Sequence, residues 1–457
     1  MEDRYTLRRV GLDQIGTRER PADDAETDAI ARRIMDEVRA AAGAVPSRPG
    51  RERAATPGTS ATAEPSVHKA ANTPGPFPAG SPVSAAAADT AADKPACAAG
   101  AAGAEAAEAV VVRLARQLDG NQGQLWYGPD DFARALAGLP AAERTALEAA
   151  AARVRAFAGA QLASLAPLSV IVPGGRAGHD VLPVGRAGCY VPGGRYPLPS
   201  TVLMTALVAR TAGVGHVAVA CPRPVPVILA ACALAGADLL LAAGGAQAIA
   251  AFAFGAGRLE PRDVIVGPGN RFVAAAKRYA QAFVRTDAPA GPSELLVIAD
   301  ESADPVTVAW DLLAQAEHDP DAVPALAATS GAVVASVEAA ISEALHELAA
   351  YRAGSADIAR AALSNGWAFV SPDAHLLAAA ANLFAPEHLE LAVQNPHDYL
   401  PLCHNAGAVF VGHTSAEALG DYGAGPNHTL PTSGRSRSSG GLSVFDFVRI
   451  RTWLELD

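Results

Sequence analysis

The segment from Gly420 to Leu430 combines side chains that take part in catalysis and metal binding. It reads GDYGAGPNHTL and carries Asp421, Asn427 and His428 among three glycines and one proline. Few of these residues are apolar, and glycine lets a backbone approach a ligand closely. The pattern therefore predicts a loop that holds polar groups beside a ligand or metal ion. A surface turn that happens to contain a histidine is the alternative.

A second segment, Asp311–Asp319, reads DLLAQAEHD and places a glutamine and a histidine three residues apart. Apolar residues around it recur at helical spacing: Val308, Leu312, Leu313 and Ala316. Gln315 and His318 should therefore share one helix face. Zinc accepts imidazole nitrogen and side-chain oxygen, so the pair suits half of a zinc site. A solvated helix end with His318 near its C-terminus is the alternative.

A third segment, Ala385–Glu390, reads APEHLE and places Glu387 and His388 side by side after a proline. The proline limits the local backbone. An adjacent acid and imidazole can divide proton transfer, one activating water and the other relaying protons. A polar strand edge or a helix start would also explain the segment.

Taken in order, these segments resemble the histidinol dehydrogenase family, whose members oxidise an amino alcohol to the amino acid histidine in two NAD-dependent steps. The resemblance runs from roughly Leu165 to Arg451. Besides the three segments above, it rests on CYVPGGRYPLPSTVLMTALVARTAGV from Cys189, GGAQAIAAFAFG from Gly244, VGPGNRFVAAAKR from Val266, AGPSELLVIAD from Ala290 and GGLSVFDFVR from Gly440.

The resemblance implies roles for matching residues. Family members hold zinc through a glutamine, a histidine and an aspartate, which correspond here to Gln315, His318 and Asp421. Glu387 and His388 resemble the family's acid-base pair, in which the histidine takes the alcohol proton and the glutamate helps to activate water.

The resemblance also implies two sets of ligand contacts. Dinucleotide contacts would fall on Tyr190, Gln247 and Asn270. Substrate contacts would fall on Ser293, His388 and the three metal ligands, with His428 lining the same pocket.

The sequence departs from the family pattern at its C-terminus. Family members continue into a helical tail with a further glutamate and a histidine, which is the fourth zinc ligand and comes from the partner subunit. This sequence ends at Asp457 and has no histidine after His428. We therefore expect a truncated tail and a zinc site with three protein ligands, which is common for catalytic zinc.

Three functions remain consistent with this pattern. The first is oxidation of histidinol to histidine through bound histidinaldehyde. The second is oxidation of another polar or amino alcohol with the same zinc and NAD machinery. The third is a catalytically impaired paralogue that acts as a binding partner.

The part after Leu165 predicts an α/β fold with parallel sheets. Short apolar segments begin at His216, Asp238 and Asp263, and each precedes a helical stretch. Ligands in such folds bind at the carboxyl ends of strands. GPGNRF lies there, so its backbone and Asn270 could meet a phosphate or ribose. No G-x-G-x-x-G fingerprint follows these strands.

We divide the chain into a helical N-terminal arm (1–43), an insertion (44–107) and two Rossmann-like domains. The first domain comprises 108–189 and 294–451 and carries the metal and acid-base residues; the second, 190–293, contacts NAD. The insertion is rich in alanine and proline with almost no large apolar residues, which predicts disorder. A tether is the alternative role for it.

Composition agrees with a cytoplasmic enzyme. The 457 residues are 50% hydrophobic and carry a net charge of −11, which disfavours nucleic acid as a partner. We find no apolar run long enough for a membrane span and no signal peptide. Five scattered cysteines predict reduced, mostly buried thiols. The resemblance adds a small amino-alcohol substrate and a homodimer.

Overall fold

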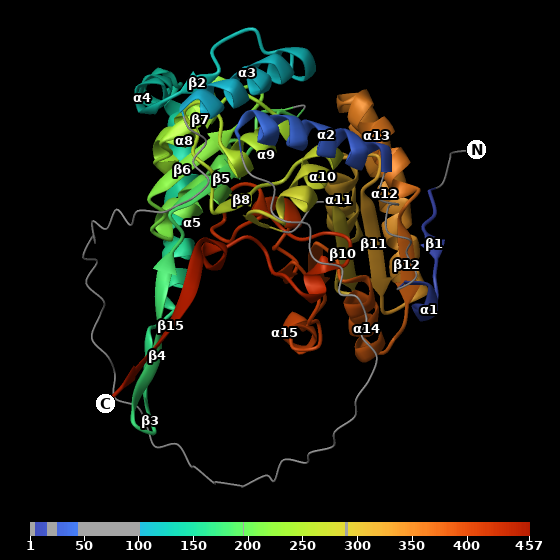
Figure 1. Cartoon of the computed structure of the whole chain (residues 1–457). Coiled ribbons are helices and arrows are strands. Elements are labelled where there is room, and N and C mark those ends of the chain that lie inside the picture. The colour runs from blue at the N-terminus through green and yellow to red at the C-terminus, as the bar shows by residue number, and fades with distance from the viewer. Residues whose placement is uncertain (1–4, 16–24, 44–100, 195, 288–290) are drawn as a thin grey trace, which may run out of the picture. The chain divides into compact units, whose positions relative to one another are not determined.

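The computed structural model describes residues 5–15, 25–43, 101–194, 196–287 and 291–457. Within these ranges the chain forms two mainly parallel sheets covered by helices, and a third, antiparallel sheet of three strands (Figure 1). The α/β class with two parallel-sheet units and a helical N-terminal arm is thereby confirmed.

The first sheet contains six strands among the described residues, in the order β1-β12-β11-β10-β13-β14, and every neighbouring pair is parallel. Its strands are β1 (Arg8–Arg9), β12 (Trp367–Val370), β11 (Val323–Ala328), β10 (Glu294–Ala299), β13 (His388–Ala392) and β14 (Ala408–Val411).

Both faces of this sheet are buried, because its residues alternate between two cores. Leu295 and Val297 of β10 join one core with α11 (Pro305–Ala316), α12 (Gly331–Tyr351) and α13 (Ala353–Leu363). Leu296 and Ile298 join the other with α14 (Ala374–Phe384). Burial on both faces explains why the strands read as continuous apolar runs.

The second sheet has the order β2-β7-β6-β5-β8-β9, and all its pairs are parallel except β2 with β7. Its strands are β2 (Trp126–Tyr127), β7 (Leu239–Leu241), β6 (His216–Ala220), β5 (Arg186–Tyr190), β8 (Val264–Val266) and β9 (Arg285–Thr286). The helices after β6, β7 and β8 are α8 (Pro226–Ala235), α9 (Gly245–Phe254) and α10 (Arg271–Ala280), as the sequence predicted.

Helices of the N-terminal arm pack on this second unit. Helix α2 (Ala25–Ala41) contacts α9 and α10, and α3 (Ala101–Leu118) contacts α2 and α9. On the other side, one core joins the sheet to α4 (Pro129–Gly138), α5 (Ala141–Ala163) and α8. A π-helical turn, η1 (Leu203–Leu207), lies between α6 (Pro199–Val202) and α7 (Val208–Thr211) and belongs to that core.

Two features differ from the sequence-based division. The insertion was expected to end at residue 107, but α3 already begins at Ala101; residues 44–100 lie outside the described residues. The division gave residues 108–189 to the first domain, but β2 pairs with β7 and β5 with β6 and β8 of the second sheet, and α4 and α5 pack on that sheet. The domain limits otherwise stay a prediction.

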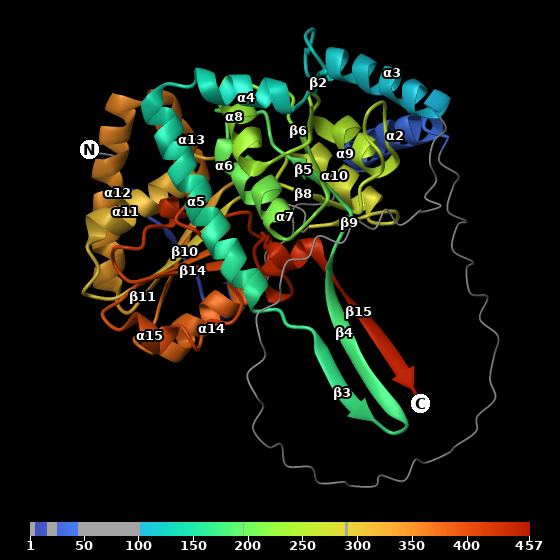
Figure 2. The same cartoon turned by 90° about the vertical axis from the view of Figure 1, so that its left-hand side faces the viewer.

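The third sheet is an antiparallel ribbon of β3 (Leu168–Val172), β4 (Gly175–Pro183) and β15 (Val448–Leu456), in the order β15-β4-β3. Figure 2 shows the ribbon without helices packed on it. Its exposed apolar side chains are Leu168, Val170, Ile171, Ile450, Leu454 and Leu456. Such a set on one small sheet is typical of an interaction surface.

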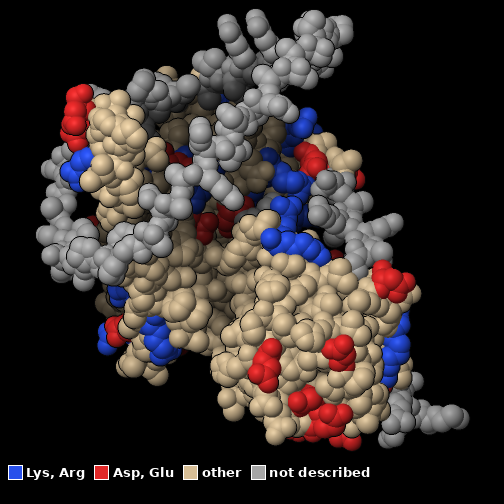
Figure 3. All heavy atoms as spheres, turned by 90° about the horizontal axis from the view of Figure 1, so that it is seen from below, with Lys and Arg blue, Asp and Glu red and all other residues tan. Residues whose placement is uncertain are grey.

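Other sequence-based expectations concern thiols and membrane spans. Cys189, Cys221, Cys232 and Cys403 are free and buried, as predicted, whereas Cys97 lies outside the described residues. Among the helices that the structure describes, none combines the length and apolar character that a membrane crossing requires. Figure 3 shows one face on which acidic and basic groups are separated by wide uncharged areas.

Candidate functional site

The predicted acid-base pair lies at the amino end of the first sheet. Helix α14 is capped by Ala385, which has φ +52°, and Pro386 then leads towards β13. Glu387 precedes the strand and His388 is its first residue, paired in register with Leu295 of β10. Because β13 lies between β10 and β14, His388 is 3% exposed. The segment is therefore part of an inner strand, and the alternative of a polar strand edge is wrong.

Hydrogen bonding fixes the tautomer of His388. Its Nδ1 lies 3.1 Å from the carbonyl oxygen of Glu294, which can only accept, so Nδ1 carries the proton. Nε2 then holds a lone pair, is buried and has no hydrogen-bond partner among the described residues. Burial lowers the pKa of His388 to about 3, which keeps the imidazole neutral near neutral pH.

Two further side chains, Glu417 and His428, complete a cluster around Nε2. Glu417 Oε1 lies 3.4 Å from Nε2 of His388 and 3.1 Å from Nε2 of His428. The two imidazole rings stack with centroids 4.6 Å apart. Potential ligand atoms of these three residues all lie within 4.8 Å of one another, a spacing that could hold a metal ion. Nε2 of His388 and Oε1 of Glu417 are both acceptors and face each other, so a proton or a cation between them would satisfy both.

The pKa values of the Glu387 and Glu417 carboxyl groups shift in opposite directions. Burial, followed by the charges of Glu294, Glu417 and Asp421, raises the pKa of Glu387 well above its usual range, although the Glu294 N–H donates to its Oε2. Burial also raises the pKa of Glu417, but the hydrogen bond from His428 and the nearby imidazoles outweigh it and lower the pKa overall. The site thus pairs a carboxyl that favours its proton with a carboxylate that favours its charge.

The three residues assigned to zinc approach this cluster from two elements. Asp304 caps α11 by accepting from the N–H groups of Val306 and Thr307, and Pro305 occupies the first turn. Gln315 lies in the last turn of α11, 1% exposed, with Oε1 lacking a partner among the described residues. His318 follows the helix end and is exposed.

The third of these residues, Asp421, follows the 3-10 turn η2 (Glu417–Gly420), which contacts α11. Asp421 Oδ1 lies 3.8 Å from Nε2 of His428. His318 is near enough to influence Glu417 and His388 electrostatically. The His318 N–H donates to the Gln315 carbonyl at 3.4 Å, but no hydrogen bond or ion pair joins the side chains of Gln315, His318 and Asp421, so the three stay a predicted ligand set.

The loop from Gly420 to Leu430 is held by contacts of its own. Asn427 donates through Nδ2 to the Met204 carbonyl, 2.6 Å away, and accepts from the Thr429 N–H. A Cβ on Gly420 would lie 2.2 Å from the His428 ring, so only glycine fits there. Asn427 therefore anchors the loop to η1, while His428 reaches the cluster.

Residues assigned to the cofactor gather at the carboxyl ends of the second sheet. Tyr190 ends β5, Gln247 lies in the first turn of α9 after β7, and Asn270 follows β8. Asn270 is exposed and caps α10 by accepting from the N–H groups of Phe272 and Val273. Gln247 Oε1, in contrast, is buried and has no partner among the described residues. Ligands bind at this end of parallel sheets. The acid-base residues instead lie at the amino ends of β10 and β13, which the sequence reasoning had not anticipated.

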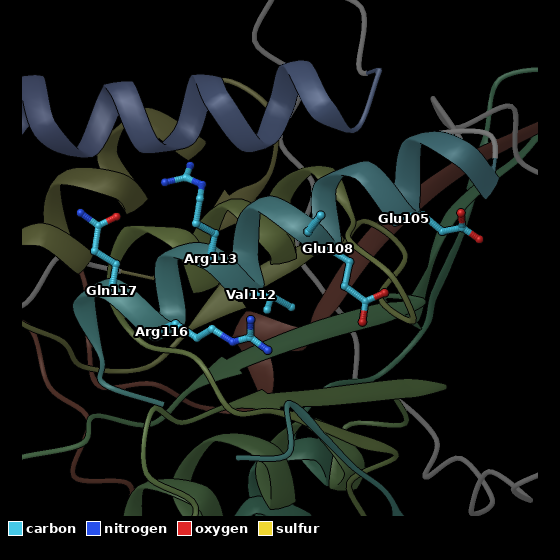
Figure 4. Close-up of a pocket in the computed structure, with 7 residues that line it drawn as sticks. Glu105, Glu108, Val112, Arg113, Arg116 and Gln117 are labelled. Atoms are coloured by element: carbon cyan, nitrogen blue, oxygen red, sulfur yellow. The ribbon is translucent and has the colours of Figure 1, made fainter. Parts of the chain in front are cut away.

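A separate pocket runs along α3 and shares no residue with this cluster (Figure 4). Two of its lining residues already have structural partners: Arg113 pairs with Glu37 of α2, and Glu108 accepts from the indole N–H of Trp126. Its lining residues are Glu105, Glu108, Ala109, Val112, Arg113, Arg116 and Gln117.

Sequence reasoning missed Glu417 and Glu294. Glu417 lies one helical turn before Asp421, a spacing that could have marked it. Glu294 contributes a backbone carbonyl, which no side-chain pattern reveals.

Fold and site together define an α/β protein with two parallel-sheet units and a buried histidine–carboxylate cluster. The family model for histidinol dehydrogenase matches residues 101–457. Histidinol dehydrogenase of Thermus thermophilus is 51% identical over 278 residues, covering 61% of this chain and 66% of that protein. The enzyme of Methanopyrus kandleri is 46% identical over 319 residues, covering 67% and 73%.

The fold agrees with a solved structure. The crystal structure of histidinol dehydrogenase from Elizabethkingia anophelis matches with a TM-score of 0.72 and 34% identity, covering 77% of this chain and 81% of that one. The chain therefore belongs to the histidinol dehydrogenase family, a family of oxidoreductases of histidine biosynthesis.

Proposed function

We propose that this protein oxidises L-histidinol to L-histidine through bound histidinaldehyde, using zinc and NAD, in the cytoplasm. The observation that carries the proposal is the buried His388, whose Nε2 lone pair faces a carboxylate and a second imidazole. A neutral, buried imidazole with one available lone pair suits a general base.

Zinc would be held by Gln315, His318 and Asp421, where it would fix the amino and imidazole nitrogens of the substrate. The partnerless Oε1 of Gln315 fits this role, because a buried amide oxygen without a donor is costly unless a ligand satisfies it. Two NAD molecules, bound one after the other, would each accept one hydride, contacting Tyr190, Gln247 and Asn270.

The chain's own residues then handle the protons. His388 Nε2 accepts the hydroxyl proton of the alcohol and, after releasing it, accepts a proton from the water that hydrates the aldehyde. Glu387 lies beside it, with its Oε2 3.8 Å from His388 Nδ1, and assists the activation of that water. Ser293 and His428 would line the substrate pocket. Burial of the pair excludes bulk water from these steps.

One experiment tests the proposal: NADH formation with histidinol and with a panel of other alcohols, with and without added zinc. We expect turnover with histidinol, and His388→Asn should lower it about 10²- to 10⁴-fold while zinc content stays unchanged. His413→Ala is the matched control, since the His413 side chain bonds to the Ser302 hydroxyl and lies near Asp300, outside the cluster, and should retain activity. If the protein oxidises the alcohol equally fast after a chelator has removed its metal, zinc takes no part in the mechanism.

Metal analysis of two variants decides which residues bind zinc. Asp421→Ala should abolish zinc binding, whereas Glu417→Gln should retain it. The reverse result would assign the ion to the cluster of His388, Glu417 and His428.

A second candidate is oxidation of a different polar or amino alcohol by the same machinery. A chain from Ruegeria pomeroyi named histidinol dehydrogenase homolog is 41% identical over 355 residues, covering 76% of this chain and 82% of that one. Faster NAD reduction with another alcohol of the panel than with histidinol would support this candidate.

The proposal includes a homodimer. The uncovered antiparallel ribbon supports it, since Ile171 is 90% exposed and five further apolar side chains are exposed on the same sheet. Light scattering should give twice the chain mass of 46.4 kDa, and Ile171→Asp should weaken the association.

A further inference from the structure

The segment that follows α3 binds the loop that follows β7. Asn121 donates through Nδ2 to the Ala242 carbonyl at 2.7 Å, and the Ala242 N–H donates to the Leu125 carbonyl at 2.7 Å. Asp119 reaches further along the same loop, to Gly244 and Gln247. An element far away in sequence therefore supports the loop that carries a proposed cofactor contact.

Asp119 controls the direction of the Gln247 amide. Asp119 Oδ2 accepts from the Gly244 N–H at 2.9 Å and from Gln247 Nε2 at 3.0 Å. A carboxylate can only accept, so the amide nitrogen of Gln247 must face it and Oε1 must point the other way. Oε1 lies against Gly245, where a Cβ would be 2.8 Å away and φ is +59°.

The orientation leaves the Gln247 side chain with one acceptor for a ligand. Gln247 Oε1 is buried and has no partner in the described part of the chain. The two N–H groups before it are engaged, since the Gly244 N–H donates to Asp119 and the Gly245 N–H to the Tyr190 hydroxyl at 3.2 Å. At Oε1 the site therefore offers an acceptor, with a carboxylate behind it, which suits a hydroxyl donor and disfavours a phosphate.

We infer that Asp119 is a positioning residue of the cofactor site, which turns Gln247 so that Oε1 accepts a hydrogen bond from a ribose hydroxyl of the dinucleotide. The inference rests on the proposed function, since it deepens the role of Gln247 there. It makes the segment after α3 part of the dinucleotide site.

The first test is Asp119→Ala in the full chain. It removes the oxygen that accepts from both the Gly244 N–H and Gln247 Nε2, so the glutamine amide loses its fixed direction. We expect the KM for NAD to rise at least tenfold, as for a lost hydrogen bond to a charged group, with kcat, the KM for histidinol and zinc content within threefold of wild type.

Asn121→Ala is the matched control. It removes a hydrogen bond from the same segment to the same loop but does not touch Gln247. It should lower the melting temperature about as much as Asp119→Ala while leaving the KM for NAD within twofold. An equal rise of that KM in both variants would reduce Asp119 to a structural role and overturn the inference.

Rescue by the conservative variant gives the sharpest readout. Asp119→Asn keeps one side-chain oxygen, which can take the place of Oδ2 and accept from both the Gly244 N–H and Gln247 Nε2. Its KM for NAD should therefore stay within threefold of wild type. A rise equal to that of Asp119→Ala would refute the inference.

Calorimetric titration of wild type with NAD separates the two levels of proposal. Absence of NAD binding by the wild type would count against the proposed function itself. Binding by the wild type with unchanged affinity in Asp119→Ala would overturn only the positioning role.

Discussion

A buried ion pair beneath the GPGN loop gives a prediction that can be worked out from the structure. Lys277 of α10 pairs with Asp287, and their side chains are 2% and 9% exposed. The pair also holds both backbone groups of Gly267: Lys277 Nζ donates to its carbonyl at 3.0 Å, and its N–H donates to Asp287 Oδ2 at 2.7 Å. Gly267 has φ +116°, and a Cβ there would lie 2.1 Å from the Tyr190 carbonyl oxygen.

Lys277→Met should therefore be strongly destabilising. It leaves Asp287 as an uncompensated buried charge, which costs about 3–5 kcal/mol of unfolding free energy. The Gly267 carbonyl loses its donor as well, a contribution of about 1–3 kcal/mol that overlaps with the first. Against a typical total stability of about 5–15 kcal/mol, the loss is large.

The measurement is urea unfolding followed by circular dichroism, with the midpoint and slope fitted separately. Arg360→Met is the control, because the Arg360–Asp357 pair at 3.0 Å is 49% and 78% exposed, and its loss should stay within about 0.5 kcal/mol. The double variant Lys277→Met with Asp287→Leu should cost at least about 2 kcal/mol less than the sum of the single changes. Single losses below about 1 kcal/mol, or strict additivity, would refute the reasoning.

Three other predictions concern different parts of the chain. Partial burial raises the pKa of Asp300, but hydrogen bonds from Ser302 and Gln394 outweigh it and lower the pKa below its usual value. Asp300→Asn should therefore destabilise at pH 7, and in melts from pH 7 to pH 3 its difference from wild type should shrink once the pH falls below about 4. Glu417→Gln should cost about 10- to 100-fold in turnover, because it removes the carboxylate that faces His388, and unchanged steady-state rates would contradict this. Deleting residues 46–98 should leave the melting temperature and activity nearly unchanged, since the sequence there has almost no large apolar residues; a variant that aggregates would show that the segment is needed.

The sequence alone determined features that depend on neighbours along the chain. Alternation of apolar segments and helices indicated the parallel sheets, because strands buried on both faces must be apolar throughout. The helix that carries Gln315 followed from its apolar spacing, although it ends at Ala316 and leaves His318 in the turn beyond. The resemblance of the motifs identified the family, which the comparisons confirmed, while the roles of the site residues stay predictions.

Tertiary structure decided what depends on contacts between distant residues. His388 meets the Glu294 carbonyl across 94 positions, and Asp119 meets Gln247 across 128. Neither partner has a local pattern that marks it, because a backbone carbonyl or a lone aspartate acquires its role only when the fold brings it to the site. The position of the acid-base pair at the amino ends of β10 and β13 follows for the same reason: strand order, which parallel pairing over long separations sets, determines which strand ends meet.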